Sequence, residues 1–422
     1  MSGAPARSLH RLGVACGLAA GAWLGAAEVP TKLVTIGISP FVISLGMVSG
    51  VFLGRWTLPM LLKGATYLLR DIRRRPHLIV WGILAGVLWA VANTLTVFAI
   101  KNVGLSIAFP LWNVNSIIGI LWGFLLFGEL RDAGANQWIK VLGGAIAILA
   151  GAAALAYASN HSVDNSRAAS VGVVSALGAG LLWGTMYIPY RKAYLSGMNP
   201  LSFVTIFTFG ELATVSILAL VFEAGFEHLR AELIQARPAL FWLFAGGLCW
   251  VIGDLFQQYA AKYLGIGRGI PLSNTNQLWG LAWGLLVFGE TSGAAAPVRL
   301  LIIGGSVLMI AGAAAVSFAE APAGERAAWK RAMERESQRY GLPLAELEAS
   351  LQGQDPVAQE PGRGLWDWTV GTAAVGVFVW AAVEVRAQPI PVNSGWMALL
   401  AAGTLFALAA GGWVLWRRTR FS

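Results

Sequence analysis

The chain has 422 residues, of which 57% are hydrophobic and only 12% are charged, and its mean hydropathy is +0.65. Soluble domains carry roughly 25% charged residues, so this composition excludes an ordinary water-soluble protein and indicates a helical membrane protein. The net charge of +9 comes from Lys and Arg residues between apolar runs, so it does not indicate a nucleic-acid surface. Both cysteines, Cys16 and Cys249, lie inside apolar runs, which excludes a disulfide framework.

Apolar runs long enough to cross a membrane recur along the whole chain. An α-helix needs about 20 apolar residues to cross a hydrocarbon layer of ~30 Å. By this criterion we predict twelve transmembrane helices, at 12–31, 35–54, 78–100, 104–127, 137–158, 169–190, 200–222, 240–261, 266–289, 297–319, 367–385 and 395–416.

The positions of Lys and Arg predict the orientation of these helices. Most of the 30 basic residues fall before the first predicted span or after an even-numbered one, including Arg55 and Lys63 after the second. Segments rich in Lys and Arg stay in the cytoplasm. We therefore expect an integral protein of the bacterial inner (plasma) membrane with both termini in the cytoplasm.

The chain also contains an internal repeat. Residues 81–129 align with 242–290 without a gap, and the first span aligns with the sixth at a shift of 159 residues. The matched residues include Pro110 with Pro271, Asn113 with Asn274, Asn115 with Asn276, and Phe-Gly-Glu at 127–129 with Phe-Gly-Glu at 288–290. Each copy holds five helices, and because five is odd, the second copy must enter the membrane from the opposite side. Such an inverted repeat is typical of secondary transporters, with the substrate near the midplane.

The repeat defines the predicted organisation of the chain. We expect an all-α polytopic membrane protein, a ten-helix inverted repeat (5+5) followed by two appended C-terminal transmembrane helices. The repeats lie at 10–158 and, inverted, at 168–319. A cytoplasmic linker with an amphipathic helix follows at 320–366, and the appended helices lie at 367–417. Small residues at every fourth position, all glycine in the first span and Gly172, Ala176, Gly180 and Gly184 in the sixth, predict close helix packing.

Two short motifs add a family resemblance. The pattern W-G-x-x-Y-x-P-x-[RK] lies at Trp183–Arg191, and Leu-Phe-Gly-Glu at 126–129 is repeated as Val-Phe-Gly-Glu at 287–290. With the inverted five-helix halves, these motifs resemble the drug/metabolite transporter superfamily, and the first resembles its glucose/ribose porter branch, which includes rhamnose-type symporters. The resemblance covers roughly residues 10–320. It implies a monosaccharide permease driven by a gradient of protons or Na+, and no enzyme activity or cofactor. The first-span copy departs from the motif, with Leu24-Gly25 in place of Trp-Gly.

Acidic residues inside predicted spans are candidates for ion coupling, since a charge in a membrane costs about 2.5–3.5 kcal/mol on insertion scales. Asp254 lies in the middle of the eighth span, where its repeat partner is the neutral Asn93, and Glu211 lies midway along the seventh. Either acid can instead be buried against a basic partner. Glu28, near the outer end of the first span, is close to Lys32 and is expected to pair with it.

Amides and aromatic rings are candidates for substrate binding. Each amide offers two donors and an acceptor, which suits sugar hydroxyls, and the prolines before the repeated asparagines would loosen the helix there. Paired asparagines can also serve as interhelical hydrogen bonds, so both roles stay open. The predicted substrate-binding residues are Asn113, Asn115, Asn274, Asn276, Gln277, Gln257, Trp89, Trp183, Tyr187 and Trp250.

Rival functions on the same sequence are a drug or metabolite exporter, a lipid-linked-sugar flippase, and a membrane sensor that uses 320–366 as its output. The four histidines lie far apart, so no metal site is expected. The expected partners are the substrate, protons or Na+ and the lipid bilayer, with no nucleic acid. Formation of a homodimer is left open.

Overall fold

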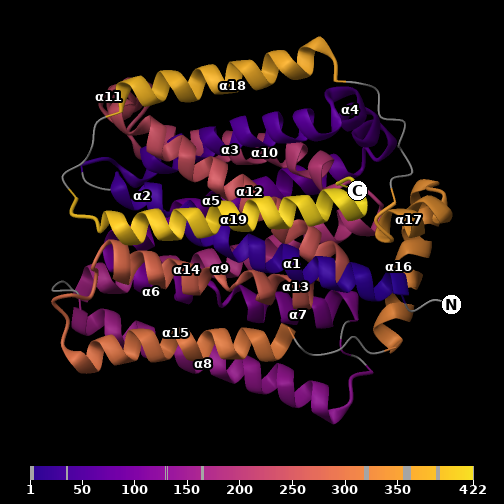
Figure 1. Ribbon diagram of the computed structural model, residues 1–422, viewed down its shortest axis with the longest axis horizontal. Coiled ribbons are helices and arrows are strands. Elements are labelled where there is room, and N and C mark those ends of the chain that lie inside the picture. Colours follow the sequence, from indigo (N-terminus) through magenta and orange to yellow (C-terminus); the bar gives the residue numbers. More distant parts are fainter. Residues whose placement is uncertain are drawn as a thin grey trace.

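The computed structural model describes residues 4–34, 37–128, 130, 132–162, 166–317, 323–354, 363–385 and 390–421. All regular structure in these residues is helical, as predicted (Figure 1). The elements are α1 (Ala4–Ala27), α2 (Val29–Leu33), α3 (Pro40–Lys63), α4 (Ala65–Arg74), α5 (Leu78–Val103), α6 (Leu105–Trp112), α7 (Asn115–Phe127), α8 (Ala135–Ser162), α9 (Ser166–Leu195), α10 (Pro200–Phe222), α11 (Phe226–Ala236), η1 (Arg237–Ala239), α12 (Leu240–Leu264), α13 (Ile266–Ser273), α14 (Asn276–Ala282), η2 (Trp283–Val287), α15 (Ala296–Ser317), α16 (Ala323–Tyr340), α17 (Leu344–Leu351), α18 (Leu365–Glu384) and α19 (Ser394–Thr419).

Eleven helical segments of the described chain are long and apolar enough to cross a membrane, which makes the protein an integral membrane protein. The sequence predicts twelve, and the difference is the predicted span at 266–289. There the chain forms three short pieces, α13, α14 and a π-helical turn, η2. The span is present but interrupted, so it does not form one long helix.

The interruption lies where the repeated Pro-x-x-Asn sequence occurs. α6 ends at Trp112 and α7 begins at Asn115, while α13 ends at Ser273 and α14 begins at Asn276. Proline has no N–H to donate, so the helix tightens after it. The backbone N–H of the asparagine three residues later donates to the proline carbonyl, at 3.1 Å in the first break and 3.2 Å in the second. Both breaks place asparagine side chains beside irregular backbone.

The helices pack in pairs that join one half of the chain to the other. α1 packs along α12 and α5 packs along α9, while α3 contacts α12 and α10 contacts α5. α8 and α15 lie together at one edge of the bundle (Figure 1). Exchanging the two predicted halves converts the α1–α12 contact into the α9–α5 contact and the α3–α12 contact into the α10–α5 contact. The same exchange leaves the α8–α15 contact unchanged.

Glycines permit the closest of these contacts. A Cβ atom built on Gly25 would lie 2.3 Å from Cβ of Trp279, and one on Gly184 would lie 2.4 Å from Cβ of Ile118. Any side chain at these positions would collide with the broken helix opposite. Small residues in membrane helices allow backbones to approach in this way. The glycine stripes of α1 and α9 therefore hold these helices against the two breaks.

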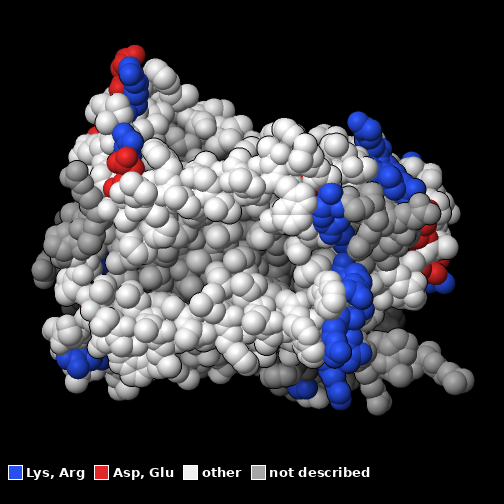
Figure 2. Space-filling model, turned by 45° about the horizontal axis from the view of Figure 1, so that its top comes forward, with Lys and Arg blue, Asp and Glu red and all other residues white. Residues whose placement is uncertain are grey.

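The two termini lie at the same end of the bundle, with α4, α16 and α17, which we call the terminal end (Figure 1). In Figure 2, Lys and Arg gather at this end, and a broad uncharged surface covers the middle of the molecule. The helices also expose large apolar side chains, Leu142, Ile146 and Val174 among them, as suits a surface in contact with lipid.

The segment after α15 folds back onto the terminal end. α16 begins at Ala323, as the charge pattern predicts, and packs against the end of α9. The guanidinium of Arg191 lies 3.4 Å from the ring centre of Trp329, and the ring centres of His77 and Tyr340 are 3.6 Å apart. Lys192 forms an ion pair with Glu336. The described part of the predicted linker is thus docked on the end of α9 through α16.

The two appended helices cover the bundle. α18 packs on α3 and α19 packs on α1. Oδ1 of Asp367 accepts a hydrogen bond from Ala65 N at 2.7 Å, which caps the start of α4. Arg363 donates to the carbonyl of Leu61, at 2.8 Å, near the end of α3. These contacts tie the C-terminal helices to α1, α3 and α4, which all lie in the first predicted half.

Candidate functional site

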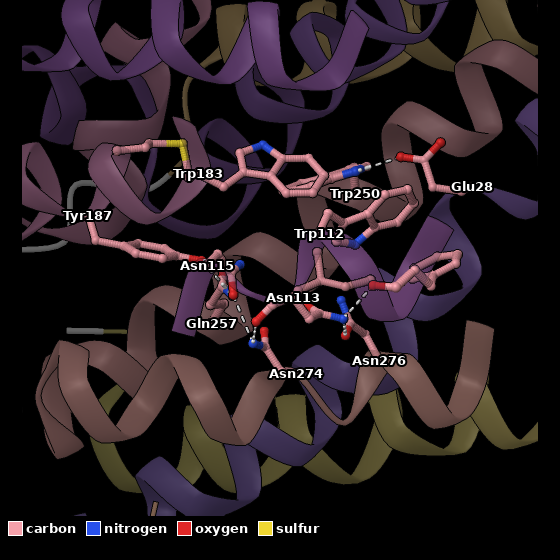
Figure 3. A pocket seen from close by; sticks show the side chains of 13 residues that line it. Glu28, Trp112, Asn113, Asn115, Trp183, Tyr187, Trp250, Gln257, Asn274 and Asn276 are labelled. Atoms are coloured by element: carbon pink, nitrogen blue, oxygen red, sulfur yellow. Dashed lines mark hydrogen bonds between the residues drawn. The ribbon is translucent and has the colours of Figure 1, made fainter. Parts of the chain in front are cut away.

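A small cavity of about 20 Å³ lies between the two helix breaks (Figure 3). That volume is enough for about one water molecule. Small-molecule sites occupy about 300–1,000 Å³, so the walls must move apart before a solute the size of a sugar can enter. α1, α6, α7, α9, α12 and α14 all contribute to it. The lining side chains are Leu24, Glu28, Phe109, Trp112, Asn113, Asn115, Trp183, Met186, Tyr187, Trp250, Gln257, Asn274 and Asn276.

Four asparagines form one wall of the cavity. Asn113 Nδ2 donates to Asn276 Oδ1 at 2.9 Å, and Asn274 Nδ2 donates to Asn115 Oδ1 at 2.8 Å. Each pair therefore joins one break to the other, and exchanging the repeats converts one pair into the other. The sequence left open whether these amides bind substrate or join helices. They line the cavity and also bond to one another.

Tyrosine and glutamine extend the amide wall. Tyr187 OH accepts long hydrogen bonds from Asn115 Nδ2, at 3.4 Å, and from Gln257 Nε2, at 3.5 Å. Gln257 also donates to Ser273 Oγ at 2.7 Å. Gln277, which the sequence places with this group, is buried but lies outside the cavity lining.

Tryptophan rings form the opposite wall (Figure 3). The ring centres of Trp112 and Trp183 are 5.7 Å apart, and those of Trp183 and Trp250 are 5.5 Å apart. Trp89 lies behind this wall, with its ring 4.9 Å from that of Trp250 and no exposed surface. It therefore supports Trp250 and does not reach the cavity.

Three polar atoms in the cavity walls have no hydrogen-bond partner among the residues that the structure describes. They are the Nε1 donor of Trp183 and two acceptors, Oδ1 of Asn113 and Oε2 of Glu28. A buried polar group without a partner costs about 1–3 kcal/mol. A hydroxyl group of a bound solute can act as both acceptor and donor, so it could satisfy atoms of both kinds.

Glu28 lies at one end of the cavity. It follows α1 directly, is 1% exposed, and accepts a hydrogen bond from Trp250 Nε1 at 3.2 Å. The sequence predicts a pair with Lys32, but Lys32 Nζ lies 3.3 Å from Glu290 Oε1. Glu290 also accepts from the backbone N–H groups of Leu105 and Ser106, both at 2.8 Å, and so caps α6. Its repeat partner Glu129 lies outside the described residues.

The two predicted ion-coupling acids lie in a second buried cluster, on the same arginine. Arg55 Nη1 is 2.5 Å from Glu211 Oε1, and Arg55 Nη2 is 2.5 Å from Asp254 Oδ2, with all three side chains fully buried. Tyr190 OH donates to Asp254 Oδ1 at 3.1 Å, and Gln258 Nε2 donates to Asp254 Oδ2 at 2.9 Å. We call Arg55, Glu211 and Asp254 the charged triad.

The position of Arg55 corrects the sequence analysis. The predicted second span stops at residue 54, which places Arg55 in a cytoplasmic loop, whereas α3 continues to Lys63 and carries Arg55 into the bundle. The guanidinium also lies 4.2 Å from the ring centre of Phe207. Two acids on other helices compensate its charge, so the helix does not need to end before it. No local signal in the sequence marks these partners.

Two transporter families match the chain. The family described as sugar transport protein matches residues 36–158, and the EamA-like transporter family matches residues 170–317. The chain belongs to the drug/metabolite transporter superfamily. The first match lies within the predicted first half of the chain, and the second match lies within the predicted second half.

Curated relatives of this superfamily member come from Streptococcus pyogenes. Proteins of serotypes M1 and M18 whose names describe them as candidate sugar uptake proteins are each 23% identical to it over 258 residues. The alignment covers 61% of this chain and 82% of each relative.

Proposed function

We propose that the protein is a secondary active transporter that takes up a monosaccharide together with a proton. The halves 10–158 and 168–319 would expose the cavity alternately to the two sides of the membrane. We place it in the bacterial inner membrane with both termini in the cytoplasm, because Lys and Arg gather at the terminal end (Figure 2).

The observation that carries this proposal is the cavity between an amide wall and a tryptophan wall. Sugar hydroxyls both donate and accept hydrogen bonds, so they can replace the bonds between Asn113 and Asn276 and between Asn115 and Asn274. The rings of Trp183 and the other tryptophans offer flat apolar faces for the C–H side of a pyranose. An exporter of apolar drugs on the same fold would have a more apolar cavity.

The charged triad supports coupling to protons. Two carboxylates face one guanidinium, so the triad carries one net negative charge when all three groups are ionised, and a single proton neutralises it. α3, α10 and α12 supply the three side chains, and α3 contacts both of the other helices. A proton on Glu211 or Asp254 would weaken the hold of Arg55 on that helix. Proton binding would thereby alter packing between the halves.

The test is counterflow in proteoliposomes, which needs no driving ion. Vesicles loaded with one unlabelled hexose, pentose or deoxyhexose are diluted into the same labelled sugar. We expect labelled sugar to enter transiently for at least one member of the panel. Asn274→Ala should reduce this exchange by about five- to 150-fold, because about 1–3 kcal/mol is lost when a buried partner is left unpaired. The matched control is Asn102→Ala, since that amide bonds to Phe98 O outside the cavity. Exchange of no sugar in sealed vesicles, or equal loss in both variants, would overturn the proposal.

A further inference from the structure

The cavity has a distinctive charge. Of the 13 side chains that line it in the described structure, Glu28 alone bears a carboxyl group. Trp250 Nε1 holds one carboxylate oxygen at 3.2 Å, so the group is fixed at the end of the tryptophan wall (Figure 3). The remaining polar lining is neutral.

Basic residues near the cavity are engaged with other acids. Lys32 lies one turn beyond Glu28 but does not line the cavity, and its Nζ is 3.3 Å from Glu290 Oε1. Arg55 bonds to both acids of the charged triad. A carboxylate inside a protein is costly unless a positive charge or hydrogen-bond donors compensate it. A bound solute can supply both.

The tryptophan wall favours the same kind of solute. The face of an indole ring is electronegative and attracts cations within about 6 Å of its centre. Trp112, Trp183 and Trp250 line the cavity that Glu28 also lines. A positively charged group in this space would gain from both the rings and the carboxylate, whereas a negatively charged group would be repelled by both.

We propose that Glu28 sets the charge preference of the substrate site, so that the cavity admits neutral and amine-bearing sugars and rejects acidic ones. This inference rests on the proposed function and specifies its substrate class. The carboxylate accepts hydrogen bonds from hydroxyl or ammonium groups of the sugar. Sugar acids and sugar phosphates bring a second negative charge into the same buried space and are excluded.

The test compares ligands that share one ring and differ in charge. D-glucose, D-glucosamine and D-glucuronate, together with the corresponding galactose series, are used in neutral buffer, where the uronate is ionised and most of the amine is still protonated. One readout is competition against counterflow of the best labelled sugar from the panel. The other is binding to the purified protein, followed by the fluorescence of its tryptophans, which requires no transport.

In the wild type we expect the amine to bind at least as tightly as the neutral sugar, and the acid at least about tenfold more weakly, from like-charge repulsion in a buried site. Glu28→Gln keeps an oxygen acceptor for Trp250 but removes the charge, so the difference between acid and neutral sugar should fall to about twofold. Glu28→Asp retains the charge and should retain the exclusion. Glu223→Gln is the control, since Glu223 is a largely buried carboxylate outside the cavity and contacts Ser39.

The two readouts separate this inference from the proposed function. Two results would overturn the role of Glu28 while leaving sugar transport intact. In the first, sugars undergo counterflow and the sugar acid competes as well as the neutral sugar. In the second, Glu28→Gln excludes the sugar acid as strongly as the wild type does. The expected binding order without any counterflow would support Glu28 and overturn transport. If Glu28→Asp binds the sugar acid as well as Glu28→Gln does, that result would also count against a role for the charge of Glu28.

Discussion

Arg55 is predicted to be indispensable for stability because it compensates two fully buried carboxylates. The perturbation is Arg55→Met, which retains most of the length of the side chain and removes its charge. Glu211 and Asp254 would then remain fully buried without the guanidinium that each contacts at 2.5 Å. The hydrogen bonds that Asp254 accepts from Tyr190 and Gln258 would stay in place.

The structure gives the magnitude. At 2.5 Å and an effective dielectric constant of about 20, each ion pair is worth about 7 kcal/mol before desolvation is subtracted. Desolvation offsets much of this, and the measured cost of removing one partner of a buried pair is about 3–5 kcal/mol. We expect Arg55→Met to lower the free energy of unfolding by that amount. The triple variant Arg55→Met, Glu211→Gln, Asp254→Asn should regain most of it, because it leaves no unpaired charge.

The assay is thermal unfolding in detergent, and its readout is the fraction of protein that stays monodisperse after heating. The control is Arg237→Met, whose pair with Glu384 is exposed and 2.8 Å long, since exposed pairs are worth at most about 1 kcal/mol. Arg55→Met should melt well below wild type and below the control. A melting temperature equal to that of Arg237→Met, or a triple variant less stable than Arg55→Met alone, would refute the buried charged triad.

Three further predictions follow from other parts of the structure. Gly184→Leu should lower the unfolding free energy by about 1–3 kcal/mol, measured by the same melting assay, because a Cβ there lies 2.4 Å from a neighbouring side chain, whereas Gly143→Leu meets open space and should be neutral. Burial lowers the pKa of His77, which stacks on Tyr340, below its usual 6.5, so docking of α16 should be complete above that pH and weaken as pH falls through the lowered pKa. Limited proteolysis of α16 should therefore be faster in acid, and His77→Gln should remove the difference; cleavage independent of pH in the wild type would contradict this. Asp254→Asn should abolish accumulation driven by a pH gradient and leave counterflow intact, and accumulation at the wild-type level would exclude a coupling role for this acid.

The helices and much of the cavity could be predicted because their determinants are local or repeated. Apolar runs define the spans, and an aligned proline with two asparagines marks each break. Asn113, Asn115, Asn274 and Asn276 all line the cavity for this reason. The alignment of the repeats brought together residues that lie far apart in the chain.

The charged residues were harder to place because their partners are distant in the sequence. Arg55 contacts Glu211 and Asp254, which lie 156 and 199 positions away, and only the packed bundle shows that α3 can carry this charge. Glu28 was assigned to Lys32 because they are neighbours on one helix face, but its carboxylate bonds to Trp250 on α12. Partners of buried charges depend on tertiary packing, which hydropathy and local spacing do not encode.

The central claim is that this protein takes up a sugar together with protons. The most direct test is whether a pH gradient makes the protein accumulate the sugar against its own concentration gradient. Proteoliposomes of fixed orientation receive a labelled sugar that supports counterflow, with the outside made acidic relative to the lumen. We predict that the internal concentration rises above the external one and returns to it when a protonophore is added. Equal internal and external concentrations, with and without the pH gradient in vesicles shown to be sealed, would contradict proton-coupled uptake.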